Sequence, residues 1–453
     1  MAAETELFSL PLSPFERYML ADDVPGCPMA YVTRLVCSGG VQRAALERGL
    51  ATAVARHPLF RARIVGRGTR RAAWVASPEP VPAIDYGPLD RPELFAAGDD
   101  LDLAVENGLR LWVREGEGRS VLCMQMHHAC ADGMGAHQFI VDWLTAYDHF
   151  AAGRPGEPQL PPLDPALLRE RTRLGLGLWG KLWRFPIHLL GAAGAMAVFA
   201  LWRPAELPST ATPAGDETLQ RLVPRHAVHV FTPTQLKALL ARARALRATL
   251  NDLLLRDLFL AIYGWNARHQ PADARRRVRI TVPVNLRDAG HAAMPAANEV
   301  GMVFIDRYPT FLARPGPLLW TVCAEMQVVK RLRFGVAFNH YCRLLYEFLG
   351  RQKPLTAGTR CLASSLLTNM GRFFHGSPLV GEDGKFRAGG LTVEQIESGP
   401  PIRPFMHASF EVFSYAGGLT LSMFYNRFHF TPAAADELLA AYVAQIEQTI
   451  ATE

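Results

Sequence analysis

The sequence predicts an α/β fold, and three observations support this class. Short apolar segments of strand length alternate with longer segments whose apolar residues recur at helical spacing. The chain has 453 residues, a length that exceeds one ordinary core and predicts two domains of about 200 residues each. Its hydrophobic residues, 49% of the total, are sufficient to form these cores. In addition, an apolar strand at 120–128 runs through a short polar turn directly into a helix.

The first elements are marked by local signals. Ser13 and Glu16 form a capping box with Pro14 at the first helical position, so a short helix begins there. Residues 31–37 are expected to form a strand. An amphipathic helix over 41–56 and a second strand over 61–65 follow.

The strand over 120–128 ends in two adjacent histidines, followed by a three-residue spacer, Asp132 and Gly133. Because side chains alternate along a strand, His127 and His128 point to opposite faces. Imidazole accepts a proton near neutral pH, so a histidine that faces a cleft can deprotonate a hydroxyl, thiol or amine. His128 is the candidate general base.

The turn after the histidines leads into a helix over 136–150. Asp132 either orients the imidazole directly or pairs with a distant arginine and holds the turn, and the second role is favoured. The N–H of Gly133 is a candidate oxyanion donor, since glycine allows backbone to approach a reacting carbonyl. Cys130 is interpreted as a small buried hydrophobe and not as a nucleophile.

The pattern His127-His128-x-x-x-Asp132-Gly133 resembles the motif of an acyltransferase superfamily. This superfamily includes peptide-synthetase condensation domains, wax ester synthase/diacylglycerol acyltransferases and alcohol acetyltransferases. In its members the second histidine is catalytic, which implies this role for His128. The segment RHPLFRARIV at 56–65 is similar to the opening of the same proteins.

Residues 153–220 are expected to connect two domains. Within them, 174–202 is apolar and carries three tryptophans but only two charged residues, Lys181 and Arg184. Its longest uncharged run, 185–202, is at the lower limit for a bilayer span and contains a proline, so the segment is not expected to cross a membrane. An interfacial anchor, a lid over a lipid-like substrate and a buried interdomain helix all stay open.

The second half opens with a strand at 227–231 and a helix capped by Thr232, and Thr249 then caps a long apolar helix. Residues 280–287 look like a further strand. They resemble a superfamily landmark whose arginine pairs with the aspartate of the histidine motif, which implies a pair between Arg287 and Asp132.

Later segments extend the resemblance over nearly the whole chain. Residues 297–301 resemble the Gly-Asn loop of the superfamily, and 364–372 resemble the Ser-Asn-x-Gly strand end of alcohol acetyltransferase relatives. The Pro-Gly-Pro version of wax synthases is absent, which argues against wax or triacylglycerol synthesis. A strand at 420–425 and a helix after Thr431 close the chain.

The resemblance implies two chloramphenicol-acetyltransferase-like domains in a V-shaped pseudo-dimer with a tunnel at their interface. The expected divisions are an N-terminal domain at 1–165, a linker at 166–220 and a C-terminal domain at 221–453. His128 would be catalytic, with four supporting residues: His127, Asp132, Gly133 and Arg287.

The implied function is transfer of an acyl group from a coenzyme A or carrier-protein thioester to an alcohol or amine, and a hydrophobic acceptor is expected. The alternatives are a stand-alone condensation domain that joins carrier-bound intermediates and a non-catalytic scaffold that docks carriers. The acyl thioester would be a co-substrate, with no permanently bound cofactor. No metal is expected, since His127 and His128 point apart and no other ligand has suitable spacing.

The remaining expectations concern location and partners. The seven cysteines have no paired spacing, and the N-terminus lacks a basic-then-apolar signal peptide, so a reducing cytoplasm is predicted. Peripheral membrane contact is expected through 174–202. The net charge of +6 comes from scattered arginines without a nucleic-acid-reading module. No nucleic-acid partner is therefore expected.

Overall fold

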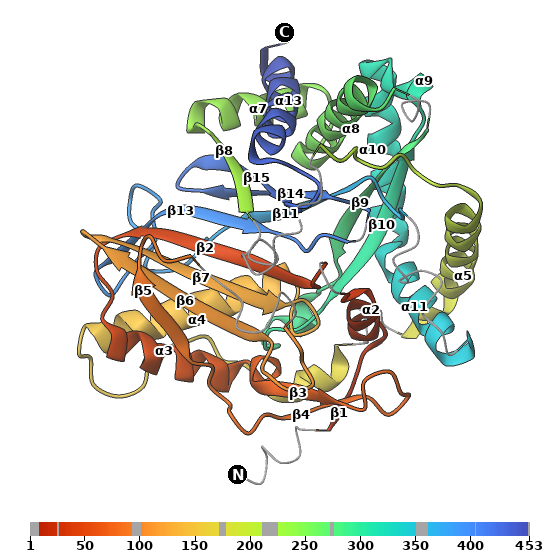
Figure 1. Cartoon of the computed structure of the whole chain (residues 1–453). Helices are drawn as coiled ribbons and strands as arrows, with labels where there is room; N and C mark the ends of the chain where they lie inside the picture. Colours follow the sequence, from red (N-terminus) through yellow and green to blue (C-terminus); the bar gives the residue numbers. More distant parts are fainter. Residues whose placement is uncertain are drawn as a thin grey trace.

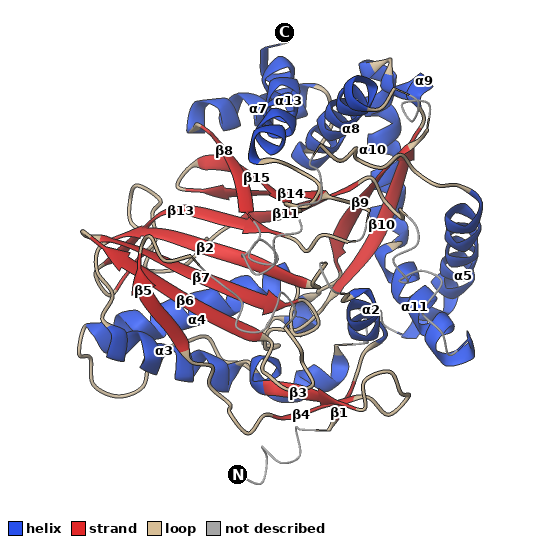
Figure 2. Cartoon of the chain, viewed as in Figure 1, coloured by secondary structure: helices blue, strands red, loops and turns tan. Residues whose placement is uncertain are grey.

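The computed structural model describes residues 9–24, 27–92, 101–171, 178–210, 225–271, 276–349, 361–403 and 405–451. Two six-stranded sheets dominate the molecule and meet near its centre (Figures 1 and 2). Both contain parallel and antiparallel neighbours, as the predicted α/β class allows.

The first sheet has the strand order β12-β13-β2-β7-β6-β5. Its strands are β2 (Ala30–Ser38), β5 (Ile84–Pro88), β6 (Leu109–Gly116), β7 (Arg119–His127), β12 (Arg387–Ala388) and β13 (Leu391–Gly399). Helices α3 (Arg43–Arg56) and α4 (Gly133–Ala151) lie against one face of it (Figure 1). Buried residues of these helices and of β2 and β7 belong to one core.

The second sheet has the strand order β10-β9-β11-β14-β15-β8. Its strands are β8 (Arg225–Phe231), β9 (Val278–Asn285), β10 (Val300–Arg307), β11 (Ser365–Arg372), β14 (Ala408–Tyr415) and β15 (Gly418–Tyr425). The helices that share its core are α7 (Pro233–Ala245), α8 (Leu250–His269), α9 (Pro309–Leu312), α10 (Pro315–Leu332) and α13 (Pro432–Ala451).

Smaller elements connect these layers. A three-stranded sheet is formed by β1 (Leu10–Pro11), β3 (Ala62–Val65) and β4 (Ala73–Ala76). The remaining helices are α2 (Pro14–Asp22), η1 (Pro58–Arg61), η2 (Pro165–Glu170), α5 (Leu178–Leu201), η3 (Ala289–His291) and α11 (Gly335–Leu349). The expected elements at 31–37, 41–56 and 61–65 are thus present with shifts of one or two residues.

The second half of the chain contributes two strands to the first sheet. β12 and β13 come from the second half of the sequence, yet β13 pairs with β2 in the first sheet. The division into 1–165, 166–220 and 221–453 stays a prediction about sequence segments. In space, part of the last segment completes the first sheet, so the halves are tied together by backbone hydrogen bonds.

The apolar segment at 174–202 is described from Leu178 onward, where it forms α5 at the edge of the molecule (Figure 1). One side of α5 contacts α11, and the Nε2–H of His188 donates to the Leu332 carbonyl at 2.8 Å. Among the described residues, no helix has the length and apolar character needed to traverse a bilayer.

Candidate functional site

His128 lies one residue past β7, in the turn that leads to α4. Its backbone N–H donates to the Met29 carbonyl at 2.7 Å. The ring makes edge contacts with Tyr31, at 5.5 Å between centroids, and lies 6.3 Å from the ring of Phe15. The strand therefore ends so that His128 faces a pocket between the two sheets.

Asn298 sets the tautomer of His128. Its amide nitrogen donates to the carbonyls of His128 and Ala129, at 2.6 and 2.9 Å. This orients the amide oxygen toward His128 Nδ1, 3.2 Å away. An amide oxygen only accepts, so Nδ1 carries the proton and Nε2 keeps a free lone pair. The ring is thereby prepared to act as a base at Nε2.

Burial keeps the His128 imidazole neutral. It lowers the pKa of His128 below its ordinary value, although the nearby Asp132 and the hydrogen bond with Asn298 act in the opposite direction. A neutral ring is the form that can accept a proton from an acyl acceptor.

His127 points to the opposite side of the strand, as the alternation predicts. Its Nδ1 accepts from the Ala129 N–H at 3.0 Å, and its Nε2 lies 3.4 Å from Asp23 Oδ2. The ring is buried at 1% exposure. These contacts hold the turn and leave His127 no access to the pocket.

Asp132 connects the histidine turn to the second half of the chain. Oδ1 accepts from the Gly135 N–H at 2.9 Å, which caps α4. Oδ2 accepts from Arg287 Nη1 at 2.7 Å and from the Glu299 N–H at 2.8 Å. Arg287 Nη2 also donates to the Ala297 carbonyl at 2.9 Å.

The electrostatics of this pair favour the ion pair over neutral groups. Burial raises the pKa of Asp132, but Arg287 and the two backbone donors outweigh it, so the pKa is lowered overall. Among the described residues the Asp132 carboxylate forms no hydrogen bond with the His128 ring, so it acts on the ring through its charge and by holding the turn. The geometry is that of a structural clamp.

Gly133 begins α4 beside the pocket. A Cβ at this position would lie 2.6 Å from Met370 Sδ and Cε, which bring β11 against the helix start. The N–H of the first helical residue has no intrahelical acceptor. It is available to a ligand in the pocket.

Cys130 is enclosed by protein. It is fully buried, and a Cβ at Gly108 would lie 2.1 Å from its sulfur. Burial raises the pKa of Cys130 well above the ordinary value, so its thiol stays protonated. This environment does not suit a nucleophile.

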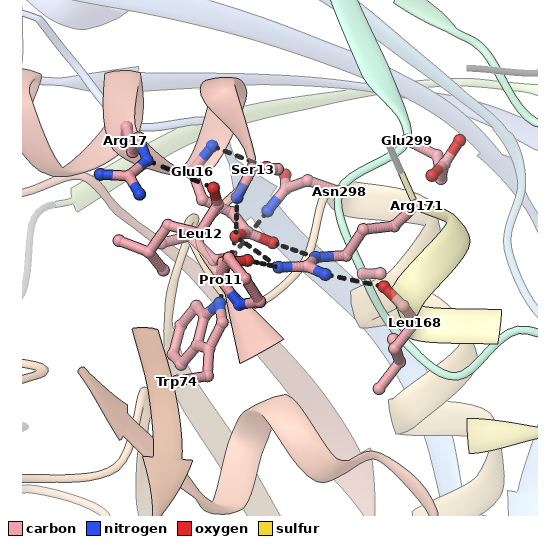
Figure 3. Close-up of polar contacts among 12 residues, drawn as sticks. Pro11, Leu12, Ser13, Glu16, Arg17, Trp74, Leu168, Arg171, Asn298 and Glu299 are labelled. Carbon is pink, nitrogen blue, oxygen red and sulfur yellow. Dashed lines mark hydrogen bonds and ion pairs between the residues drawn. The ribbon is translucent and has the colours of Figure 1, made fainter. Parts of the chain in front are cut away.

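A buried ion pair supports the site from the N-terminal side (Figure 3). Arg171 Nε lies 2.6 Å from Glu16 Oε1, and Glu16 Oε2 also accepts from Trp74 Nε1 at 3.1 Å. Glu16 is the third helical residue of the capping box that starts α2, and Arg171 follows η2. The pair fastens the end of η2 against α2, and Arg171 also interacts electrostatically with Glu299.

The pocket has walls from both sheets. The helix α4 contributes Met134, and β11 contributes Met370. Other side chains at the pocket come from β2, β9, β10, β13 and β14, among them Thr33, Pro283, Met302, Ser398 and Glu411. A molecule that reaches His128 therefore contacts both halves of the chain.

Sequence reasoning named His127, His128, Asp132, Gly133 and Arg287, and the structure brings the last four to the pocket. It did not name Asn298 as a partner of the histidine. The signal that could have identified Asn298 was the resemblance of 297–301 to the Gly-Asn loop.

In the described part of the chain, no three His, Cys, Asp or Glu side chains are grouped as a metal site would require.

Comparisons with known sequences give distant relatives. No family model matches the chain. Two uncharacterised proteins from two strains of Mycobacterium tuberculosis are 28% identical over 297 residues, 62% of this chain and 62% of theirs. A chondramide synthase from Chondromyces crocatus is 31% identical over 150 residues, 30% of this chain and 4% of that protein. The match thus spans less than two thirds of each relative.

Solved structures show the fold. The first condensation domain of the CDA synthetase has a TM-score of 0.68 at 14% identity, with 97% of this chain and 96% of that one covered. Polyketide synthase associated protein 5 from Mycobacterium tuberculosis has a TM-score of 0.65 at 18% identity, with 98% of both covered. The starter condensation domain of rhizomide synthetase, solved with C8-CoA and Leu-SNAC, has a TM-score of 0.65 at 14% identity, with 100% and 96% covered.

The chain therefore has the condensation-domain fold, which consists of two chloramphenicol-acetyltransferase-like halves. The predicted resemblance and fold class are confirmed.

Proposed function

We propose that the protein transfers an acyl group from a thioester to an acceptor hydroxyl or amine, with His128 as the general base. The observation that carries this proposal is the fixed tautomer of His128 at the pocket: Asn298 holds Nδ1, so Nε2 is free to take a proton. The condensation-domain fold supports the class of reaction.

The proposed step needs no covalent enzyme intermediate. Nε2 of His128 takes the proton of the acceptor as its oxygen or nitrogen attacks the thioester carbonyl. The C–S bond breaks as the new ester or amide bond forms, and the imidazolium returns the proton to the leaving thiolate. The N–H of Gly133 is proposed to stabilise the oxyanion, since a backbone donor beside the reacting carbonyl lowers the barrier.

An acyl-transfer panel tests the proposal. The protein is incubated with octanoyl-coenzyme A and with an octanoyl carrier protein, each with alcohols and amines, while free thiol and acylated product are measured. We expect thiol release that depends on acceptor and equals the product formed. Absence of product with both donors across the panel would leave a docking scaffold as the better account.

The pH profile should report the His128 environment. Because burial lowers the pKa of His128, the base stays unprotonated to more acidic pH than a free imidazole. We expect kcat/KM to rise with pH through an apparent pKa below about 6.5 and then to level off. A midpoint above this value would indicate that another group supplies the base.

We further propose that α5 contacts an anionic membrane surface. Its outward residues Trp183, Leu190 and Leu201 are 53%, 74% and 69% exposed, and the helix contains no Asp or Glu. The guanidinium of Arg184 lies 4.3 Å from the Trp183 ring. Exposed apolar groups on a helix whose own charged residues are all basic suit an interface of acidic lipid.

Vesicle co-sedimentation tests this contact. The protein should bind phosphatidylglycerol vesicles more than phosphatidylcholine vesicles, and added salt should weaken the binding. Trp183→Ser with Leu190→Ser should abolish it. Trp320→Ser, which removes an exposed tryptophan from α10, should not. Equal binding of the double variant and the parent would assign α5 to protein packing alone.

A further inference from the structure

Glu411 is a buried carboxyl in the pocket that the proposed reaction does not use. It lies on β14, opposite Thr368 of β11 and Ser422 of β15, and is 4% exposed. The other pocket-facing side chains of this sheet are neutral, for example Pro283 and Met302. An ionised carboxylate in such a position is costly unless a cation pairs with it.

The other carboxylates at the pocket already have basic partners. Arg403 Nη2 donates to Asp22 Oδ1 at 2.9 Å, and Arg287 pairs with Asp132 at 2.7 Å. Among the described residues, Ser398 is the side chain that hydrogen-bonds to Glu411, and no Lys, Arg or His forms an ion pair with it. Ser398 in turn lies 3.1 Å from Thr33 Oγ1.

No charge in the described part of the pocket would compensate an ionised Glu411, which therefore keeps its proton near neutral pH. Burial raises the pKa of Glu411 to about 8, and no basic side chain counteracts this rise. Burial lowers the pKa of both pocket histidines, His128 and His137, and raises that of Tyr18 and Tyr31, so these groups are uncharged near neutral pH. Both arginines are engaged by aspartates. No described side chain therefore supplies a cation to Glu411, which leaves the carboxyl available to a cationic group of a ligand.

We propose that Glu411 determines acceptor specificity by pairing with an ammonium group of the acceptor that is not the group acylated at His128. A carboxylate next to an amine favours its protonated form, and an ammonium has no lone pair with which to attack. The acceptor is therefore bifunctional: a hydroxyl or neutral amine reaches His128, and a second, protonated amine reaches Glu411. This inference rests on the proposed acyl transfer.

The test compares a length series of α,ω-amino alcohols with the corresponding 1-alkanols, using octanoyl-coenzyme A as donor. The protein should prefer the amino alcohol of matching length by about 10–100-fold in kcat/KM, the range of a hydrogen bond to a charged group. In Glu411→Gln, which keeps the shape of the side chain, this preference should disappear while the rate with the alkanol is retained. Glu382→Gln, an exposed substitution, should leave the preference intact.

A binding arm separates this inference from the proposed reaction. Calorimetric titration with the same compounds needs no turnover, so a protein that transfers no acyl group still gives a result. Glu411 holds its proton near neutral pH and should release it when the ammonium binds. The binding enthalpy should then depend on the ionisation enthalpy of the buffer for the parent and not for Glu411→Gln. Equal affinity for amino alcohol and alkanol, or a preference that survives in Glu411→Gln, would overturn the inference.

Discussion

His128→Ala should lower the rate of acyl transfer by about 10²–10⁴-fold, the usual contribution of a general base. The fold should remain, because the His128 ring faces the pocket and the backbone bond to Met29 does not depend on the side chain. The measurement is kcat with saturating acceptor, together with a thermal unfolding midpoint close to that of the parent.

The control for this prediction is His375→Ala, which removes an exposed histidine. It should change neither the rate nor the unfolding midpoint. Asn298→Asp gives a second comparison: both Asp oxygens accept, so Nδ1–H stays bound, but the donors to the two carbonyls are lost. A His128→Ala variant with full activity would assign the chemistry to another residue.

Asp132→Ala should destabilise the fold by about 3–5 kcal/mol, because it leaves a charged Arg287 without its partner in a largely buried site. It also removes the cap of α4 and the acceptor of the Glu299 N–H. Arg287→Ala should cost less, since Asp132 would still cap α4 and accept from the Glu299 N–H. The measurement is the free energy of unfolding in denaturant.

The double variant Asp132→Ala/Arg287→Ala isolates the contact. Its destabilisation should be smaller than the sum of the single effects by about 0.5–3 kcal/mol, the range found for residues in direct contact. Additive free energies of unfolding would mean that the pair contributes nothing to stability.

Local sequence signals predicted most of what positions the histidines. The alternation along the strand separated His127 from His128. The cap at Asp132 explains why α4 begins at Gly133, three residues before the predicted start at 136. The contact of Asp132 with Arg287 was implied only by resemblance. The two residues are separated by 155 positions, and no local pattern specifies such a contact.

Other features of the site had no local signal. The capping box at Ser13 predicted that Glu16 caps the helix, but it did not predict the ion pair of Glu16 with Arg171. One carboxylate makes both contacts, and only the cap has a local sequence signal. Glu411 lies between the apolar residues Phe410 and Val412 in its strand, and no sequence pattern there predicts that it faces the pocket. Strand β13 joins the first sheet through pairing with β2, far away in the chain. Tertiary packing decides all three.

The proposed reaction is direct transfer of the acyl group from thioester to acceptor with His128 as base. A single-turnover reaction, quenched over time and followed by mass spectrometry of both intact protein and product, tests it. We predict that acylated acceptor accumulates at the rate of thiol release, that the protein never gains the mass of the acyl group, and that His128→Ala slows both processes together. An acylated protein that forms and decays at the rate of product formation would contradict the claim.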